Sequence, residues 1–195
     1  MFFSTLRPPE SKYFWVHKKN AVDESILSTI DDYMDKQNLN QGETVGNHEC
    51  RDSRIHWMTD QRYQNLLMPV YNDITSMVES INDRNWRYII DGWEPFQYAE
   101  YDESYRGYFD WHIDLAIPFK SPSQPLSRKL SFSLGLSDRN DYEGGGLIIN
   151  FGKEKTFKLG RGEIVIFPSW MLHKVAPVTT GKRKVIVGWG LGSII

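Results

Sequence analysis

The chain has 195 residues, a formal net charge of -2, a single cysteine and an aromatic share of 14%. This length is enough to bury a core in one domain, and the lone Cys50 excludes an internal disulfide. The charge balance gives no general attraction to nucleic acid or to an anionic membrane, so neither is an expected partner. The start of the chain does not resemble a signal peptide, and no apolar run reaches the ~18 residues of a membrane span. We therefore expect a soluble, cytoplasmic protein.

Helical patterns occupy the first part of the chain. Residues 12–17 predict a strand, and Asp23 predicts the N-cap of a helix with an apolar stripe between Ile26 and Met34. Residues 53–57 predict another short strand. A second apolar stripe at helical spacing spans residues 66–81, and Pro69 is expected to divide it into a short piece and a longer helix.

From residue 86 onward the pattern changes to strands. The predicted strands are 86–91, 95–101, 108–115, 129–136, 146–151, 154–158, 163–167, 171–175 and 183–190. Helices followed by many short strands predict a mainly β fold, a sandwich or jelly roll with the helices packed on one outer face. We interpret residues 1–195 as one domain, with a support region at 1–85 and a β core at 86–195.

The strand predicted at 129–136 has two unlike faces. One face carries large apolar side chains at positions 130, 132, 134 and 136, which must be buried, most simply against the helices. The other carries only Ser131, Ser133 and Gly135. This small polar face fits a cavity for a small ligand and a solvent-facing sheet equally well.

The segment around His112 has the pattern of a metal site. In an extended strand, His112 and Asp114 point to the same side. A His-x-Asp triplet is common by chance and, taken alone, favours an ordinary structural histidine. A third ligand, His173, would complete the two-His-one-carboxylate triad of a non-haem Fe(II) oxygenase, which leaves positions open for substrate and oxygen.

Arg183 follows on the next predicted strand, with Val185, Val187 and Trp189 on the same side. A guanidinium beside an apolar wall can hold the remote carboxylate of a dicarboxylate keto acid by bidentate, charge-assisted hydrogen bonds. Residues 179–182 predict a tight reversal that brings the Arg183 strand back beside His173.

These residues belong to a longer series of motifs. The series reads Tyr101…His112-x-Asp114…Leu136-Ser137-Asp138…Asp141-Tyr142-Glu143-Gly144-Gly145-x-Leu147…Phe167-Pro168…His173-x-Val175-x-Pro177-Val178-Thr179-x-Gly181-x-Arg183. Over residues 95–190 it resembles the Fe(II)/2-oxoglutarate-dependent dioxygenases, and more narrowly the prolyl 4-hydroxylase-like branch and the bacterial PKHD-type hydroxylases.

The resemblance implies a double-stranded β-helix in which His112, Asp114 and His173 bind Fe(II) and Arg183 binds 2-oxoglutarate. It implies O2 as co-substrate, stimulation by ascorbate, and hydroxylation of a C–H bond with release of succinate and CO2. Further cofactor-binding positions implied by the resemblance are Tyr101, Leu147 and Trp189. Gly135 stands where animal oxygen-sensing relatives have a tyrosine, so Ser131, Ser133 and Tyr101 are candidates to replace its hydroxyl.

The substrate is expected to be a prolyl residue in a peptide or protein. A free amino acid, another small metabolite and a catalytically silent binding module remain alternatives. Candidate substrate contacts are Tyr105, Tyr108 and Tyr142, in or beside loops 102–108, 117–127 and 138–143. The acidic stretches at 102–103 and 138–143 argue against nucleic-acid repair. Because ligating histidines must be neutral, iron affinity is expected to fall below a pH of about 6. The sequence predicts no oligomeric state.

Overall fold

Two antiparallel sheets and two α-helices form the part of the chain that the structure, a computed structural model, describes: residues 14–42, 50–115 and 126–193. The helices are α1 (Glu24–Met34) and α2 (Gln64–Asn85). The major sheet contains β1 (Val16–Lys18), β2 (Asn40–Gln41), β4 (Arg54–Trp57), β5 (Gly92–Trp93), β6 (Gln97–Asp102), β8 (Leu126–Gly135), β9 (Tyr142–Gly144), β12 (Ile164–Pro168) and β14 (Val178–Ser193). The minor sheet contains β3 (Arg51–Asp52), β7 (Tyr108–His112), β10 (Leu147–Asn150), β11 (Glu154–Phe157) and β13 (Leu172–Val175).

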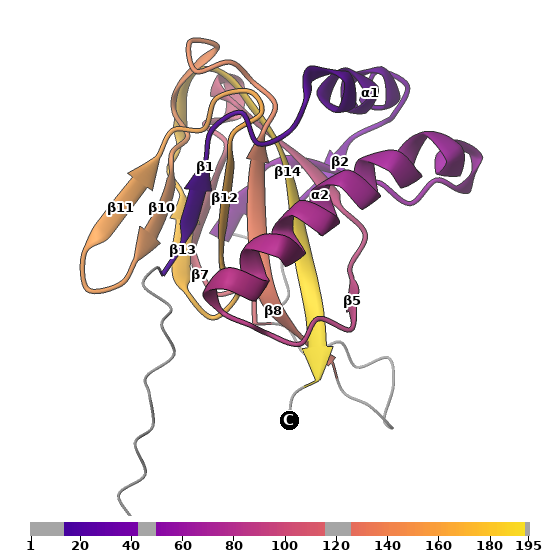
Figure 1. Cartoon of the computed structure of the whole chain (residues 1–195). Coiled ribbons are helices and arrows are strands. Elements are labelled where there is room, and N and C mark those ends of the chain that lie inside the picture. The colour runs from indigo at the N-terminus through magenta and orange to yellow at the C-terminus, as the bar shows by residue number, and fades with distance from the viewer. Residues whose placement is uncertain (1–13, 43–49, 116–125, 194–195) are drawn as a thin grey trace, which may run out of the picture.

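The strand order of each sheet shows how distant segments are brought together. The major sheet runs β1-β12-β8-β14-β6-β4-β2, with β5 and β9 also paired to β14, and the minor sheet runs β11-β10-β13-β7-β3. Both helices lie outside the major sheet on the same side (Figure 1). The predicted mainly β jelly roll with helices on one outer face is therefore confirmed.

The helices cover the apolar face of β8. Leu130, Phe132 and Leu134 are buried in one core cluster with side chains from both helices: Leu27, Ile30, Tyr33, Met34, Leu67, Val70, Ile74 and Val78. Each fully buried aliphatic side chain of this kind contributes about 1.5–3 kcal/mol relative to exposure. The predicted burial of this face against the helices is confirmed. The opposite face of β8 points toward the interior between the two sheets. Neither described helix is long and apolar enough to cross a membrane.

The predicted division of the second helix at Pro69 is wrong. A 3-10 turn at Gln61–Tyr63 leads directly into α2, which continues through the proline without a break. The proline lies early in the helix and removes one backbone hydrogen bond. Leu67 and Val70, on either side of it, are buried against the sheet, so packing offsets that loss.

The strand predicted at 86–91 is also wrong, because α2 extends to Asn85 and only Gly92–Trp93 pairs with β14. Arg87 has a left-handed backbone with φ of 56°, which turns the chain. The side chain of Asn82 accepts a hydrogen bond from the Tyr88 amide at 3.0 Å and donates to its carbonyl at 2.8 Å. The alternating apolar residues of this loop pack on the helical core cluster rather than in a sheet.

The reversal predicted at residues 179–182 does not exist. Those residues lie inside β14, and the chain instead turns between Val175 and Val178. Arg183 therefore pairs with Tyr101 of β6 in the major sheet, whereas His173 lies in the minor sheet. The two residues face the same interior space from opposite sheets. Most of the predicted loop 117–127 lies outside the described residues.

Candidate metal centre and adjoining cavity

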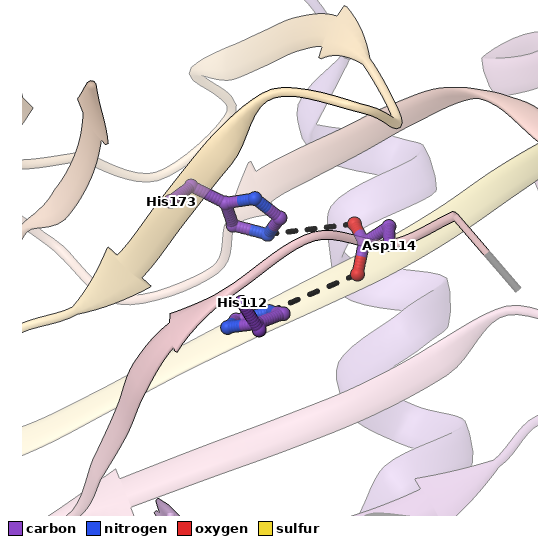
Figure 2. A group of neighbouring side chains, drawn as sticks. All are labelled: His112, Asp114 and His173. Carbon is purple, nitrogen blue, oxygen red and sulfur yellow. Dashed lines mark ion pairs between the residues drawn. The ribbon is translucent and has the colours of Figure 1, made fainter.

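His112, Asp114 and His173 come together between the two sheets. His112 ends β7 and lies directly opposite His173 of β13, while Asp114 follows β7 and is held by a hydrogen bond from its amide to the Ser169 carbonyl at 2.9 Å. The Nε2 atoms of His112 and His173 are 3.7 Å and 3.4 Å from the two carboxylate oxygens of Asp114 (Figure 2). One potential ligand atom from each residue lies within 4.8 Å of the others.

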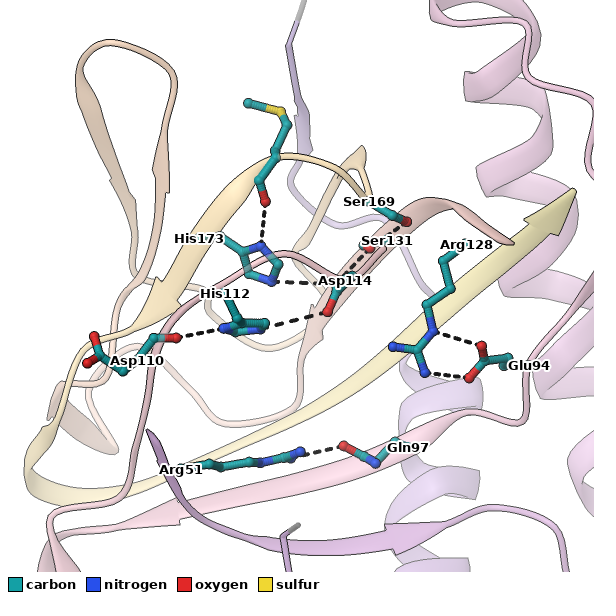
Figure 3. Close-up of polar contacts among 11 residues, drawn as sticks. Arg51, Glu94, Gln97, Asp110, His112, Asp114, Arg128, Ser131, Ser169 and His173 are labelled. Atoms are coloured by element: carbon teal, nitrogen blue, oxygen red, sulfur yellow. Dashed lines mark hydrogen bonds and ion pairs between the residues drawn. The ribbon is translucent and has the colours of Figure 1, made fainter. Parts of the chain in front are cut away.

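Backbone carbonyls fix the orientation of both imidazoles. Nδ1 of His112 donates to the Asp110 carbonyl at 2.7 Å, and Nδ1 of His173 donates to the Met171 carbonyl at 2.8 Å (Figure 3). Since a carbonyl only accepts, Nδ1 of each ring is the donor, which leaves Nε2, the atom that faces Asp114, as the potential metal ligand. This is the arrangement that a metal-binding histidine requires.

Ser131 supports the carboxylate. Its hydroxyl donates to Oδ2 of Asp114 at 2.7 Å and lies 2.9 Å from the hydroxyl of Ser169. The structure thus places Ser131, one of the predicted cofactor-binding residues, behind the potential metal ligand and not among the residues that line the adjoining cavity.

Burial and mutual electrostatics set the charge states of the triad. Burial, aided by the nearby His173, lowers the pKa of His112 to about 4. Burial acts to raise the pKa of Asp114, but His173 and His112 outweigh it and hold that pKa below its ordinary value. A neutral imidazole beside an ionised carboxylate is the protonation state that binds a divalent cation. The loss of iron affinity below a pH of about 6 stays a prediction.

A cavity opens from the triad between the sheets. It is lined by Arg51, Gln97, Tyr101, Phe109, His112, Asp114, Phe132, Ser133, Leu147, Phe167, His173, Val175, Arg183, Val187 and Trp189. The sequence fitted either a ligand cavity or a solvent-facing sheet beside the small face of β8. At Ser133 the structure has the cavity. Five other residues that the sequence placed at the site, Tyr101, Leu147, Arg183, Val187 and Trp189, also line this space.

Arg183 is a buried cation that has no anionic partner among the described residues. Its side chain is 2% exposed, and its Nε and Nη1 atoms have no hydrogen-bond partner among the described residues. Nη2 reaches the Ser133 hydroxyl only at 3.5 Å, and the guanidinium lies 5.1 Å from the centre of the Tyr101 ring. Because a buried, unpaired charge is costly, this guanidinium fits a site completed by a bound carboxylate.

The backbone around Gly135 leaves no room for a tyrosine, the residue that the resemblance gives to animal oxygen-sensing relatives at this position. A Cβ at this position would collide with the carbonyl oxygen of Gly160. Ser133 and Tyr101 are therefore the hydroxyl-bearing residues beside Arg183 in the structure.

The three tyrosines predicted as substrate contacts are not among the residues that line the cavity. The structure does not support this role for Tyr142, whose ring is 1% exposed and whose hydroxyl donates to the Leu159 carbonyl at 2.8 Å. The Tyr105 hydroxyl donates to the Glu100 carbonyl at 3.1 Å, and its ring lies under the Arg54 guanidinium. For Tyr108, on the β7 strand beside β3, substrate contact stays a prediction.

The sequence analysis did not identify Arg51 and Gln97, which line the cavity together with Phe109. Phe109 stacks on the His112 ring with centroids 3.6 Å apart, and the Arg51 guanidinium lies 4.8 Å from the Phe109 ring centre. Arg51 and Gln97 are joined by a hydrogen bond of 2.9 Å (Figure 3). No motif marked these residues, since they reach the site through the pairing of β3 with β7 and of β6 with β14.

Residues 96–190, which contain the triad and Arg183, match the family model described as the 2OG-Fe(II) oxygenase superfamily. These residues are a domain of that superfamily. The superfamily takes its name from Fe(II) and 2-oxoglutarate, and the residues present suit both. Two neutral imidazoles and a carboxylate are the ligand set of non-haem Fe(II), and the unpaired Arg183 suits the remote carboxylate of 2-oxoglutarate.

The curated relatives that the chain matches include PKHD-type hydroxylases. The chain is similar to a PKHD-type hydroxylase of Synechococcus sp. (strain CC9605), with 47% identity over 83 residues, 42% of this chain and 35% of that protein. A PKHD-type hydroxylase of Alteromonas mediterranea is 31% identical over 148 residues, 74% of this chain and 58% of that protein. The matched segment thus spans about a third of the length of the first of these relatives.

Solved structures share the fold at low sequence identity. A Pseudomonas putida prolyl-4-hydroxylase superposes with a TM-score of 0.70 at 18% identity, covering 92% of both chains. A Trichoplax adhaerens prolyl hydroxylase, solved in complex with a hypoxia inducible factor peptide fragment, gives a TM-score of 0.69 at 18% identity and covers 91% of this chain and 83% of that one. Both confirm the jelly-roll fold.

Proposed function

We propose that the protein is an Fe(II)- and 2-oxoglutarate-dependent dioxygenase that hydroxylates a C–H bond, releasing succinate and CO2. One observation carries the proposal: a single cavity has a His-Asp-His triad in one wall and an unpaired, buried arginine in another. A silent binding module would need neither the matched tautomers of the histidines nor a buried charge without a partner.

Each group of this chain has a separate task in the proposal. His112, Asp114 and His173 hold Fe(II), and the backbone carbonyls and Ser131 keep these ligands in place. Arg183, with Ser133 and Tyr101 beside it, holds the remote carboxylate of 2-oxoglutarate. When bound, the metal, 2-oxoglutarate and O2 supply the oxidising chemistry, which is the cofactors' own. Leu147, Val187 and Trp189 form the apolar wall that keeps water from this space.

For the substrate we propose a prolyl residue in a peptide or protein. The likeness to prolyl hydroxylase structures, one of them with a bound peptide, supports this choice. A free amino acid is the second candidate, and the buried Arg51 beside the metal centre is the observation that favours it.

Succinate formation from labelled 2-oxoglutarate tests the proposal. The assay contains Fe(II) and ascorbate with a panel of proline-containing peptides and free amino acids, and compares the wild type with His112→Ala and Arg183→Ala. His56→Ala is the matched control, because His56 bonds Tyr33 outside the site. We expect turnover in the wild type and the control and a loss of at least about a hundredfold in both site variants. Equal turnover in the wild type and His112→Ala would contradict the proposal.

A further inference from the structure

Arg51 is a second buried arginine in the same cavity. It lies in β3 at the edge of the minor sheet, its side chain is only 8% exposed, and it lines the cavity together with the triad and Arg183. The Arg51 guanidinium packs on the Phe109 ring, and Phe109 in turn stacks on the His112 ring. The Phe109 ring therefore links Arg51 to a potential metal ligand. This places it within reach of a small molecule or a short side chain held at the metal.

Neutral groups hold the Arg51 guanidinium in place. Nε donates to the Ser53 hydroxyl at 2.7 Å and Nη2 donates to Oε1 of Gln97 at 2.9 Å. Ser53 and Gln97 are themselves buried, which keeps the fork rigid. A Cβ at Gly42 would lie 2.8 Å from Nε of Arg51, so the glycine leaves the path of this side chain open. The guanidinium is therefore oriented but not neutralised.

Within the part of the chain that the structure describes, no neighbouring charge compensates Arg51. Among the described residues, no carboxylate forms an ion pair with Arg51, whereas Arg128 and Arg54 are both paired with a carboxylate. Arg128, which lies over the Trp189 ring, is bound by both oxygens of Glu94, at 2.7 Å and 2.6 Å. Arg54 pairs with Asp52 at 3.1 Å. Arg51 shares with Arg183 the condition of a buried cation that lacks an anion.

The charges of the loaded cavity show what is missing. Arg51, Arg183, Asp114 and a divalent metal together leave three positive charges in excess. Dianionic 2-oxoglutarate, bound at Arg183 and the metal, removes two of them. One positive charge remains, and it is located at Arg51. In a low-dielectric cavity such a charge strongly favours an anionic ligand.

We propose that Arg51 is a carboxylate-binding subsite for the substrate, so that the hydroxylated molecule presents an acid group to Arg51 while its reacting carbon faces the metal. The inference rests on the proposed function and narrows its substrate class to carboxylates. The carboxylate has two possible sources: the α-carboxylate of a free amino acid or C-terminal residue, and the acidic side chain of a residue next to the target. Planar, bidentate recognition of either is the chemistry for which a fixed guanidinium fork is suited.

The test follows the Nε–H signals of Arg51 and Arg183 by NMR in the full chain, with Zn(II) in place of iron. Loss of one signal in Arg51→Gln and of another in Arg183→Gln assigns the two. N-oxalylglycine, a non-reactive analogue of 2-oxoglutarate, is added first and is expected to shift Arg183 and leave Arg51 largely unchanged. Acetate, N-acetylproline and a C-terminally amidated Asp-Pro peptide are then titrated, each against its uncharged amide.

We expect saturable shifts of Arg51 with the carboxylates and none with the amides. In Arg51→Gln, the dissociation constant of the tightest carboxylate should rise by about ten- to a hundredfold. Arg54→Gln on the neighbouring strand is the control and should bind as the wild type does. Preference for N-acetylproline over the amidated Asp-Pro peptide would identify an α-carboxylate as the source, and the reverse preference an acidic side chain.

Two results would overturn the inference and leave the proposed function standing. In the first, N-oxalylglycine shifts the Arg183 signal but none of the carboxylates shifts the Arg51 signal. In the second, N-oxalylglycine binds at a single site and, at saturation, shifts the Arg51 signal itself. If N-oxalylglycine moves neither arginine, the proposed function fails with it.

Discussion

His112 and His173 lie directly opposite each other on two adjacent strands of the minor sheet, with ring centroids 4.2 Å apart. The antiparallel pairing of β7 with β13 brings these two residues together although they are far apart in the sequence. Each ring is oriented by a hydrogen bond to the backbone carbonyl two residues earlier in the chain. The metal centre is thus built on rigid strands, and only Asp114 lies beyond a strand end. That ligand is the one that depends on side-chain support.

Replacing Ser131 with alanine should weaken metal binding. The substitution removes the hydrogen bond to Asp114, and loss of such a supporting contact lowers metal affinity by about ten- to a hundredfold. Anaerobic competition with a metal chelator measures the effect. Ser127→Ala, on the same strand and also buried, is the control and should keep the wild-type affinity. An unchanged affinity in Ser131→Ala would show that Asp114 does not need this contact.

Adding a methyl group at Gly135 should destabilise the fold. The new Cβ would collide with backbone at Gly160, which cannot move as freely as a side chain, so we expect Gly135→Ala to lower the free energy of unfolding by about 1–3 kcal/mol. Gly92→Ala is the matched control, since a Cβ there meets nothing within 4 Å. Thermal unfolding of both variants decides the point, and equal midpoints would argue against the close approach of Gly160 to β8.

Stability should fall in acid through Glu163. Burial acts against ionisation of this carboxyl, but hydrogen bonds from Arg139 and His17 outweigh it and hold the pKa of Glu163 below its ordinary value. A depressed carboxylate pKa gives stability that is complete above the unfolded pKa and is lost as pH falls through the folded pKa.

Glu163→Gln should therefore cost about 1 kcal/mol at pH 7 and progressively less as the pH falls below about 4. Urea unfolding across this pH range measures the difference between the two proteins. Glu154→Gln, on an exposed part of β11, is the control. A difference that stays constant with pH would contradict the role assigned to Glu163.

The sequence predicted the parts of the fold that depend on local patterns. Side-chain alternation placed Leu130 and Leu134 against the helices, and it put Val187 and Trp189 on the cavity side of the Arg183 strand. It failed where a local pattern had two physical readings. The alternation of Trp86, Tyr88 and Ile90 comes from a loop packed on the core, and the glycine at 181 bends a continuous strand instead of reversing the chain.

The site was predictable only as far as its motifs reach. The triad and Arg183 carry recognisable spacing, so all four could be named from the sequence. Arg51 could not, because its place beside Phe109 depends on the pairing of a two-residue strand with β7, which no local pattern signals. Likewise, the support that Ser131 gives to Asp114 depends on where the chain runs after β7, beyond the last regular strand position.

The most direct test of the central claim is anaerobic calorimetry of 2-oxoglutarate binding to the Fe(II)-loaded protein, for the wild type, Arg183→Ala and His173→Ala. The proposed site predicts that 2-oxoglutarate binds at one site per chain and that its binding requires both the metal triad and Arg183. Arg183→Ala should bind metal normally but lose about ten- to a hundredfold in 2-oxoglutarate affinity, and His173→Ala should lose the metal and the 2-oxoglutarate that depends on it. Unchanged 2-oxoglutarate affinity in Arg183→Ala, or binding that does not depend on the metal, would contradict the account.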